Sequence, residues 1–338
     1  MWNALQWIQK NLALSIPAAM LLGLGYGSVA DASALKAAIL PLTFLMVYPM
    51  MVSLNMAELR HLQGFKTQGL ALGLNFLAIP ALGYGLGLLF FPDEPWFRLG
   101  LLLTALLPTS GMTISWTGMA KGNMAAAVRM TVLGLLLGSL LAPLYLQALM
   151  GTVVSVPMGQ VFVQIAVVVF LPLVLGTLTQ KWLVAKHGHQ PFNHQIKPKF
   201  APFSTLGVLG IVWLSMALKA PDLLARPAQM LTLLLPLLVL YGVNFALSTW
   251  LARTLLPRGD GIALVYGTVM RNLSIALAIA MSVFGTQGAD VGLLIALAYI
   301  VQVQAAAWYM KWTPLLFPPS AHAAALTLSG TDGSPPRP

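Results

Sequence analysis

Long apolar stretches recur along the chain and limit what it can fold into. A membrane-spanning helix needs about 20 mostly apolar residues, because each helical residue advances about 1.5 Å through the bilayer. Charged residues make up 8% of this 338-residue chain, whereas about 25% is usual in soluble domains. The sequence therefore predicts an all-α integral membrane protein with ten transmembrane helices. The predicted spans cover residues 11–30, 35–56, 67–91, 97–119, 123–150, 157–184, 200–220, 228–252, 262–285 and 290–316.

The basic residues are divided unequally between the two sides of these spans. Lys and Arg gather in cytoplasmic loops, so we predict a multi-pass protein of the cell (plasma or inner) membrane with both termini cytoplasmic. The same rule explains the net charge of +10 without a nucleic-acid partner. The start, MWNALQWIQK, does not resemble a removable signal peptide. The richer side carries Lys10, Arg60, Lys66, Lys121, Lys181, Lys186, Lys197, Lys199, Arg253, Arg258, Lys311 and Arg337, and the other side carries Lys36, Arg98, Lys219 and Arg226.

The two halves of the chain share weak similarity. The second span ends in VYPMMVSLNMAEL and the seventh in VWLSMALKAPDLL, while LNF (74–76) and VNF (243–245) fall in the third and eighth. Because five spans reverse the direction of the chain, a second copy would be inverted in the membrane, as in many secondary transporters. We therefore predict five-helix repeats at residues 1–150 and 151–317. Residues 318–338 have too few apolar residues to pack and are predicted to form a disordered cytoplasmic tail.

Arg271 lies near the middle of the ninth span, where a charge is costly and marks a functional site by default. Every Asp and Glu, by contrast, falls at the edge of an apolar stretch or between stretches. Two interpretations stay open. The guanidinium either holds unwound carbonyls of the fourth helix together as a strut, or it binds an anion, as Arg does well with carboxylates and oxyanions. Asn272 and Ser274 follow it and belong to the same candidate site.

The fourth span contains the other half of this candidate site. Pro108 lacks an amide donor and Gly111 is conformationally permissive, so a break here would free backbone groups. Those groups would lie beside the hydroxyls of Thr109, Ser110 and Thr113. The alternative is a kinked helix whose hydroxyls bond their own carbonyls.

Three further polar residues within apolar stretches are weaker candidates. Arg129 lies near the start of the fifth span, where it either joins the site or extends its guanidinium to the cytoplasmic surface. Asn75 and Asn244 occupy matching places in the predicted repeats. They either contact a solute or bond across helix interfaces.

Signs of catalysis and of cofactor or metal binding are weak. The chain has no cysteine, which excludes disulfides and thiolate chemistry. His187, His189 and His194 fall in a polar segment without an acid to complete a metal site, and we expect a solvated loop there. The glycines of GYGLG (83–87) lack the strand-to-helix context of a nucleotide fingerprint. Since no acid, histidine or cysteine lies inside a span, we expect no enzyme, no cofactor and no metal.

Four motifs together resemble the bile acid:sodium symporter superfamily, especially its arsenite-permease-like branch. They are LTFLMVYPMMVSLNMAEL in the second span, LNF-x3-PALGYGL in the third, M-x3-W-x3-AKGN in the fourth and RNLSIALAIAMSVFG in the ninth. The resemblance covers nearly all ten predicted helices. It implies two inverted five-helix repeats in which helices four and nine break and cross, forming a core domain that moves against a panel domain.

Departures from the family pattern bear on the solute and the coupling ion. The resemblance places Thr109 where arsenite permeases have a metalloid-binding cysteine, and Ser274 where they have a glutamate. Sodium-coupled relatives have an acid and amides in the stretch that matches 267–272, and Arg271 takes an amide position. Thr113 and Thr131 still offer oxygens, but no carboxylate remains to balance a sodium ion, and a guanidinium repels one. We infer loss of sodium coupling, with a proton the favoured coupling ion.

These observations predict a secondary transporter that moves a small anionic solute by alternating access. Arg271 would bind or orient the solute, with hydrogen bonds from Thr109, Ser110, Thr113, Asn272 and Ser274. One alternative is an arsenite or antimonite efflux permease that uses hydroxyls for a neutral trihydroxide. The other alternative is a membrane receptor or sensor that does not transport, against which the lack of a sizeable soluble output domain argues.

Overall fold

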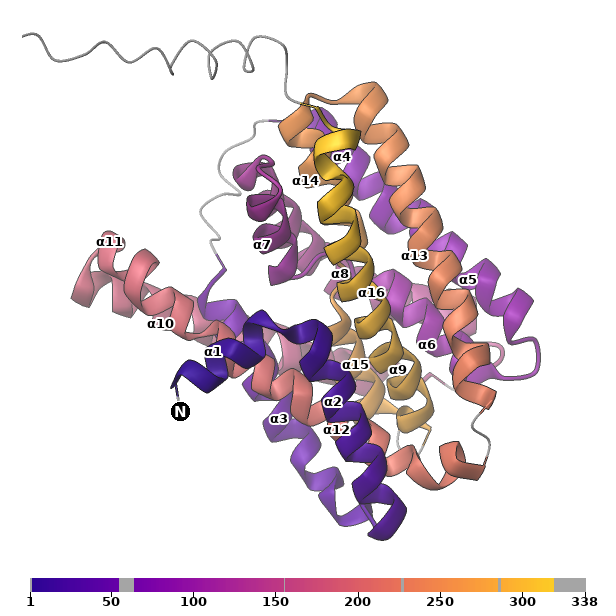
Figure 1. Ribbon diagram of the computed structural model, residues 1–338. Coiled ribbons are helices and arrows are strands. Elements are labelled where there is room, and N and C mark those ends of the chain that lie inside the picture. Colours follow the sequence, from indigo (N-terminus) through magenta and orange to yellow (C-terminus); the bar gives the residue numbers. More distant parts are fainter. Residues whose placement is uncertain (1, 55–63, 155, 226–227, 285–286, 319–338) are drawn as a thin grey trace, which may run out of the picture.

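The computed structural model describes residues 2–54, 64–154, 156–225, 228–284 and 287–318, and these residues form helices and connections without a strand (Figure 1). The helices are α1 (Trp2–Lys10), α2 (Leu12–Val29), η1 (Ser33–Ala38), α3 (Ile39–Val52), α4 (Phe65–Gly73), η3 (Leu74–Ala78), α5 (Ile79–Phe90), α6 (Pro95–Leu106), α7 (Gly111–Met119), α8 (Met124–Met150), α9 (Met158–Ile165), η4 (Ala166–Phe170), α10 (Leu171–His187), α11 (His189–Pro191), η5 (Phe192–Ile196), η6 (Lys197–Lys199), α12 (Ala201–Ala225), α13 (Ala228–Leu255), α14 (Arg258–Val269), α15 (Leu273–Val283) and α16 (Gly288–Leu316).

The all-α membrane architecture is confirmed, whereas the number of spans is only partly so. Within the described residues, eight helical runs are long and apolar enough to cross a bilayer, or nine if the bent pair α6–α7 is one span. The first predicted span corresponds to a shorter apolar helix, Leu14–Val29. Ten spans and the inverted repeat therefore stay predictions.

The first residues form α1, a segment for which no secondary structure was predicted. One predicted segment differs in the structure. The predicted loop around His187, His189 and His194 is largely helical: α10 ends at His187, Gly188 follows with φ of 84°, and short helices begin at once. Residues 319–338, nearly all of the predicted tail, lie outside the described residues, as do the predicted loop residues Arg60 and Arg226.

The helices pack in two groups (Figure 1). In the first group, α12 packs along α2 and α3, and α10 packs on α3. The second group holds α5, α6, α13, α14, α15 and α16, with α8 against α14. Contacts of α12 with α16 and of α15 with α3 join the groups. The span formed by α14 and α15 is almost wholly buried, which places it at the centre of the molecule.

Proline shapes the backbone beside that central span. Pro80 has no N–H to give to the carbonyl of Phe76, four residues earlier, and η3 is a π-helical turn that ends two residues before this proline. The hydroxyl of Tyr145, on α8, donates to the Phe76 carbonyl instead. Asn75 lies within this π turn and is buried.

Glycines allow α2 and α12 to approach closely. A Cβ added at Gly27 would lie 2.1 Å from the Ala217 carbonyl oxygen, and one at Gly23 would lie 2.3 Å from that of Trp213. Small residues four apart are a usual means of close helix packing in membranes. Gly25, between them on α2, has open space around its Cβ position.

We expect Gly27→Ala to lower the unfolding temperature of the detergent-solubilised protein, because the new methyl group must push α2 away from α12. Gly25→Ala is the matched control on the same helix. It should leave the temperature unchanged or raise it slightly, since alanine favours helix over glycine. Thermal unfolding followed by intrinsic fluorescence measures both. Equal effects of the two variants would contradict this description of the interface.

Candidate functional site

Two helical runs are interrupted at the centre of the molecule, and their interruptions meet. The first lies between α6 and α7, which are bent by 56°. The second lies between α14 and α15, at residues 270–272. The backbone N–H of Asn272 donates to the Leu107 carbonyl at 2.8 Å, which joins one interruption to the other. The break expected in the fourth helix is therefore present.

The sequence explains the break between α6 and α7. Leu107 precedes a proline and is extended, as such residues prefer, so α6 ends at Leu106. Thr109 then takes a left-handed conformation, with φ of 52°. Ser110 caps α7: its hydroxyl accepts from the Met112 N–H, and its own N–H donates to the Thr113 hydroxyl, both at 3.3 Å.

Glycines on α8 leave room for the residues of this break to approach closely. A Cβ added at Gly134 would lie 2.3 Å from Oγ1 of Thr109, and one at Gly138 would lie 2.8 Å from Cδ of Pro108. The Thr109 hydroxyl lies 3.4 Å from the carbonyl oxygens of Met130 and Thr131 and donates to them. The two glycines thus let the left-handed threonine sit against the backbone of α8.

The second interruption is held by residues that the sequence analysis did not select. Gln302, on α16, accepts from the Arg271 N–H at 2.8 Å and donates to the Arg271 carbonyl at 3.4 Å. The Tyr241 hydroxyl, on α13, donates to the same Gln302 oxygen at 2.9 Å. The side chain of Asn272 caps α15 by accepting from the Ile275 N–H at 3.3 Å. A glutamine within the apolar run 290–316 was the available signal for Gln302.

Arg271 is 1% exposed, and its guanidinium donates to four protein oxygens. It bonds the side-chain oxygen of Asn75 and the carbonyl of Ala105, and it lies 3.2 Å from the Thr268 carbonyl and 3.4 Å from that of Thr104. Thr104 and Ala105 are in the last turn of α6, where carbonyls lack helical donors and the helix dipole favours a cation. This geometry supports the strut interpretation.

The two candidate asparagines also hold the end of α14. The side-chain amide of Asn75 donates to the Gly267 carbonyl, and that of Asn244 donates to the Thr268 carbonyl, both at 3.0 Å. Ser248 then donates to the oxygen of Asn244 at 3.0 Å. Both asparagines thus bond across helix interfaces, which was one of their two predicted roles.

Other candidate hydroxyls are partly occupied. Thr113 donates to the Tyr266 carbonyl at 3.3 Å, and Ser274 pairs with the Tyr299 hydroxyl at 2.5 Å. In contrast, Nδ2 of Asn272 is buried and has no hydrogen-bond partner within the described part of the chain. The amide of Asn272 and the capping hydroxyl of Ser110 are thus the side-chain groups at the two helix starts that remain available to a solute.

Arg129 is not among the hydrogen-bond partners found for Arg271, Asn272 or Asn75. Its side chain is buried near the start of α8, and a Cβ added at Gly64, the residue before α4, would lie 3.8 Å from its Nη2 atom. The hydrogen bonds found for Arg271 thus do not link the two arginines directly.

The described residues place no carboxylate against Arg271. Asp260, at the opposite end of α14, accepts from Asn123 at 2.6 Å and from Thr67 at 2.9 Å. Asp290 pairs with Lys219 at 2.7 Å, between α16 and α12. Over the described part of the chain, no group of three or more His, Asp and Glu side chains is close enough to hold a metal ion. The interruptions thus surround a positive charge with neutral oxygens.

Comparison with known proteins gives matches along most of the chain. The model of the Sodium Bile acid symporter family matches residues 40–226, which is more than half of the chain. An arsenical-resistance protein, Acr3, of Corynebacterium glutamicum is 25% identical, over 93% of this chain and 92% of its own length. One from Alkaliphilus metalliredigens is 25% identical over 72% of each chain. Sodium/bile acid cotransporter 7 of Xenopus tropicalis is 24% identical over 57% of this chain and 56% of its own.

We expect Arg271→Met to lower the unfolding temperature strongly, because methionine fills the space and leaves the carbonyls of Thr104, Ala105 and Thr268 without this donor. Each buried group that loses its partner costs about 1–3 kcal/mol. Arg271→Lys should be intermediate, since one ammonium cannot reach all the acceptors. Lys181→Met, at an exposed site, is the control. Thermal unfolding in detergent measures all three, and an Arg271→Met variant as stable as the control would exclude the strut.

Proposed function

This chain belongs to the sodium bile acid symporter family and is a membrane transporter, and we propose that it moves a small anionic solute without sodium. The observation that carries the proposal is the guanidinium of Arg271, bonded to neutral oxygens where the two interruptions meet. Carbonyl and amide oxygens are the ligands that hard cations prefer. Here these oxygens accept hydrogen bonds from the guanidinium of Arg271, a cation that is part of the protein.

The fixed charge argues against sodium in two ways. The oxygens of Asn75, Ala105 and Thr268 already accept hydrogen bonds from the guanidinium. A sodium ion placed among them would also meet a like charge in a medium where repulsion is strong, with no carboxylate among the described neighbours to offset it. We therefore propose a proton in place of sodium as the coupling ion.

The same charge favours an anionic solute. Arg271 makes four guanidinium hydrogen bonds to the protein, out of five possible N–H donors, so it acts as a fixed positive charge and an organiser of the site instead of gripping the solute bidentately. Direct contacts would come from Ser110 and Asn272, which cap α7 and α15. Helix starts carry partial positive charge and free N–H groups, which suit an anion. Thr109, Thr113 and Ser274 would line the site.

The proposed movement is alternating access between the two helix groups. Both interruptions lie in the group that contains α6, α14 and α16, while α2, α3, α10 and α12 form the other group. Two inverted five-helix repeats, with both termini cytoplasmic in the plasma membrane, are part of this proposal. Asn75 and Asn244 would steady the end of α14 during the movement, and Arg129 would lie near the cytoplasmic entrance.

A second candidate function is efflux of arsenite or antimonite. It rests on the similarity, over nearly the whole chain, to a protein named for arsenical resistance. A neutral trihydroxide would bond to the Ser110 hydroxyl and the Asn272 amide without needing the charge of Arg271. The two candidates therefore differ in whether the solute needs that charge.

We expect uptake into proteoliposomes to be equal in sodium chloride and choline chloride. The solute is first chosen by thermal shift of the purified protein with small carboxylates, sulfate, phosphate and arsenite. Arg271→Ala and Arg271→Lys should each reduce transport at least tenfold, whereas the control Lys181→Ala should retain it. A strict need for sodium, or unchanged transport in both Arg271 variants, would refute the proposal.

The same measurement separates the alternatives. Flux of arsenite alone, with resistance conferred on an efflux-deficient host, would assign the second candidate function. Saturable binding of a solute with no flux in either direction would instead indicate a receptor.

A further inference from the structure

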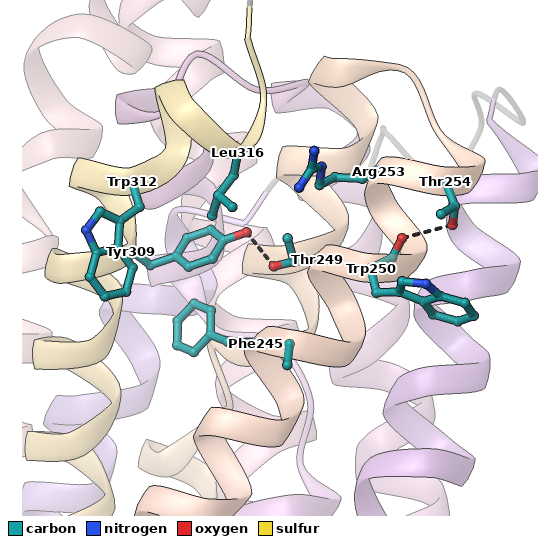
Figure 2. A pocket seen from close by; sticks show the side chains of 9 residues that line it. Phe245, Thr249, Trp250, Arg253, Thr254, Tyr309, Trp312 and Leu316 are labelled. Carbon is teal, nitrogen blue, oxygen red and sulfur yellow. Dashed lines mark hydrogen bonds between the residues drawn. The ribbon is translucent and has the colours of Figure 1, made fainter.

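A groove of about 600 Å³ lies between α13 and α16, and no residue of the two interruptions lines it (Figure 2). Phe245, Thr249, Trp250 and Arg253 line it from α13, and Tyr309 and Trp312 line it from α16. It is found where α13 approaches its last residue, Leu255, and α16 approaches Leu316. The groove therefore opens on the flank of the bundle, near one end of the two helices.

Side-chain contacts hold the floor of the groove in place. The rings of Phe245 and Tyr309 lie 4.7 Å apart between centroids, and the hydroxyls of Tyr309 and Thr249 are 2.5 Å apart. Tyr309 also packs edge-on against Tyr266 of α14, at 6.0 Å. These contacts fix the floor, so the hollow is part of the folded structure.

Exposed apolar side chains surround the groove. Trp250 is 62% exposed and Trp312 is 57% exposed, on opposite helices, and Trp308 and Leu315 are exposed nearby on α16. Large exposed apolar side chains on spanning helices contact acyl chains, and Trp collects at the level of the lipid headgroups. A molecule in the groove would thus have its apolar part in the bilayer.

The groove also presents a positive charge. Figure 2 shows the guanidinium of Arg253 extending from α13 toward Leu316 of α16, above the Tyr309–Thr249 pair. Arg253 is exposed and makes no hydrogen bond or ion pair with any described residue.

More basic groups lie at the same end of the molecule. Arg258 donates to the carbonyls of Phe317 at 2.9 Å and of Lys121 at 3.2 Å. Lys121 and Lys311 have exposed side chains. The carboxylate of Asp260, in the first turn of α14, already accepts from Asn123 and Thr67. The surface around the groove is therefore positive.

We infer that this groove binds an acidic diacyl phospholipid from the bilayer. Its phosphate would pair with Arg253, which suits phosphate by its planar set of donors. The indoles of Trp250 and Trp312 would lie beside the glycerol region, and an acyl chain would follow Phe245 down α13. A lipid fits better than a free anion because the walls are mostly apolar. It fits better than a second copy of the chain because the surrounding surface would repel its own charge.

The test compares lipids on the full chain in mixed micelles. Phosphatidylglycerol should raise the unfolding temperature of the wild-type protein more than phosphatidylcholine does, and inorganic phosphate should have no effect. Arg253→Ala should lose most of the difference between the two lipids, and Arg253→Lys should keep part of it. Lys181→Ala, which removes an exposed charge on α10, should keep all of it.

Four outcomes would overturn the inference. Equal shifts with both lipids would remove the role of charge, and a full shift in Arg253→Ala would place the lipid elsewhere. A shift produced by inorganic phosphate alone would assign the groove to a soluble anion. Light scattering gives an independent check: a dimer that Arg253→Ala dissociates would assign the groove to a second copy.

Discussion

A buried positive charge bonded to neutral oxygens is the interaction on which the centre of this structure depends. Arg271 joins the open end of α6, through Thr104 and Ala105, to the end of α14, through Thr268. In a bilayer, free carbonyls at depth are costly unless something satisfies them. A helix break in this place requires a donor, and the guanidinium provides several. The charge therefore explains how two helices can be interrupted inside the membrane.

Neighbouring helices are shaped to fit the same centre. The π turn η3 carries Asn75, which links the guanidinium to α14, and Gly134 on α8 leaves room for the left-handed Thr109. Gln302 closes the second interruption from α16 by bonding both backbone groups of Arg271. Each of these contacts fills space or satisfies a backbone group that a helix break would otherwise leave open. A network whose members are satisfied favours one conformation, and Nδ2 of Asn272 is the buried side-chain group at these interruptions left without a partner among the described residues.

The membrane class, the all-helical architecture and the break after Leu106 followed from apolar length, proline and small polar residues. The choice between strut and ligand for Arg271 did not follow from the sequence. It depends on which carbonyls come close to the guanidinium, and those of Thr104 and Ala105 lie 167 and 166 residues away along the chain. Gln302 was missed for the same reason: a lone glutamine in an apolar run has no local pattern that names its partner. The helical segment after Gly188 was missed because polar composition does not exclude helix.

A fixed charge in the place of a bound cation is the central claim. It is tested most directly by equilibrium binding of radioactive sodium to the purified wild-type protein, with choline as the replacement cation. The account predicts no saturable sodium binding, because the guanidinium of Arg271 already occupies the oxygens. Saturable binding of sodium by the wild-type protein would contradict it.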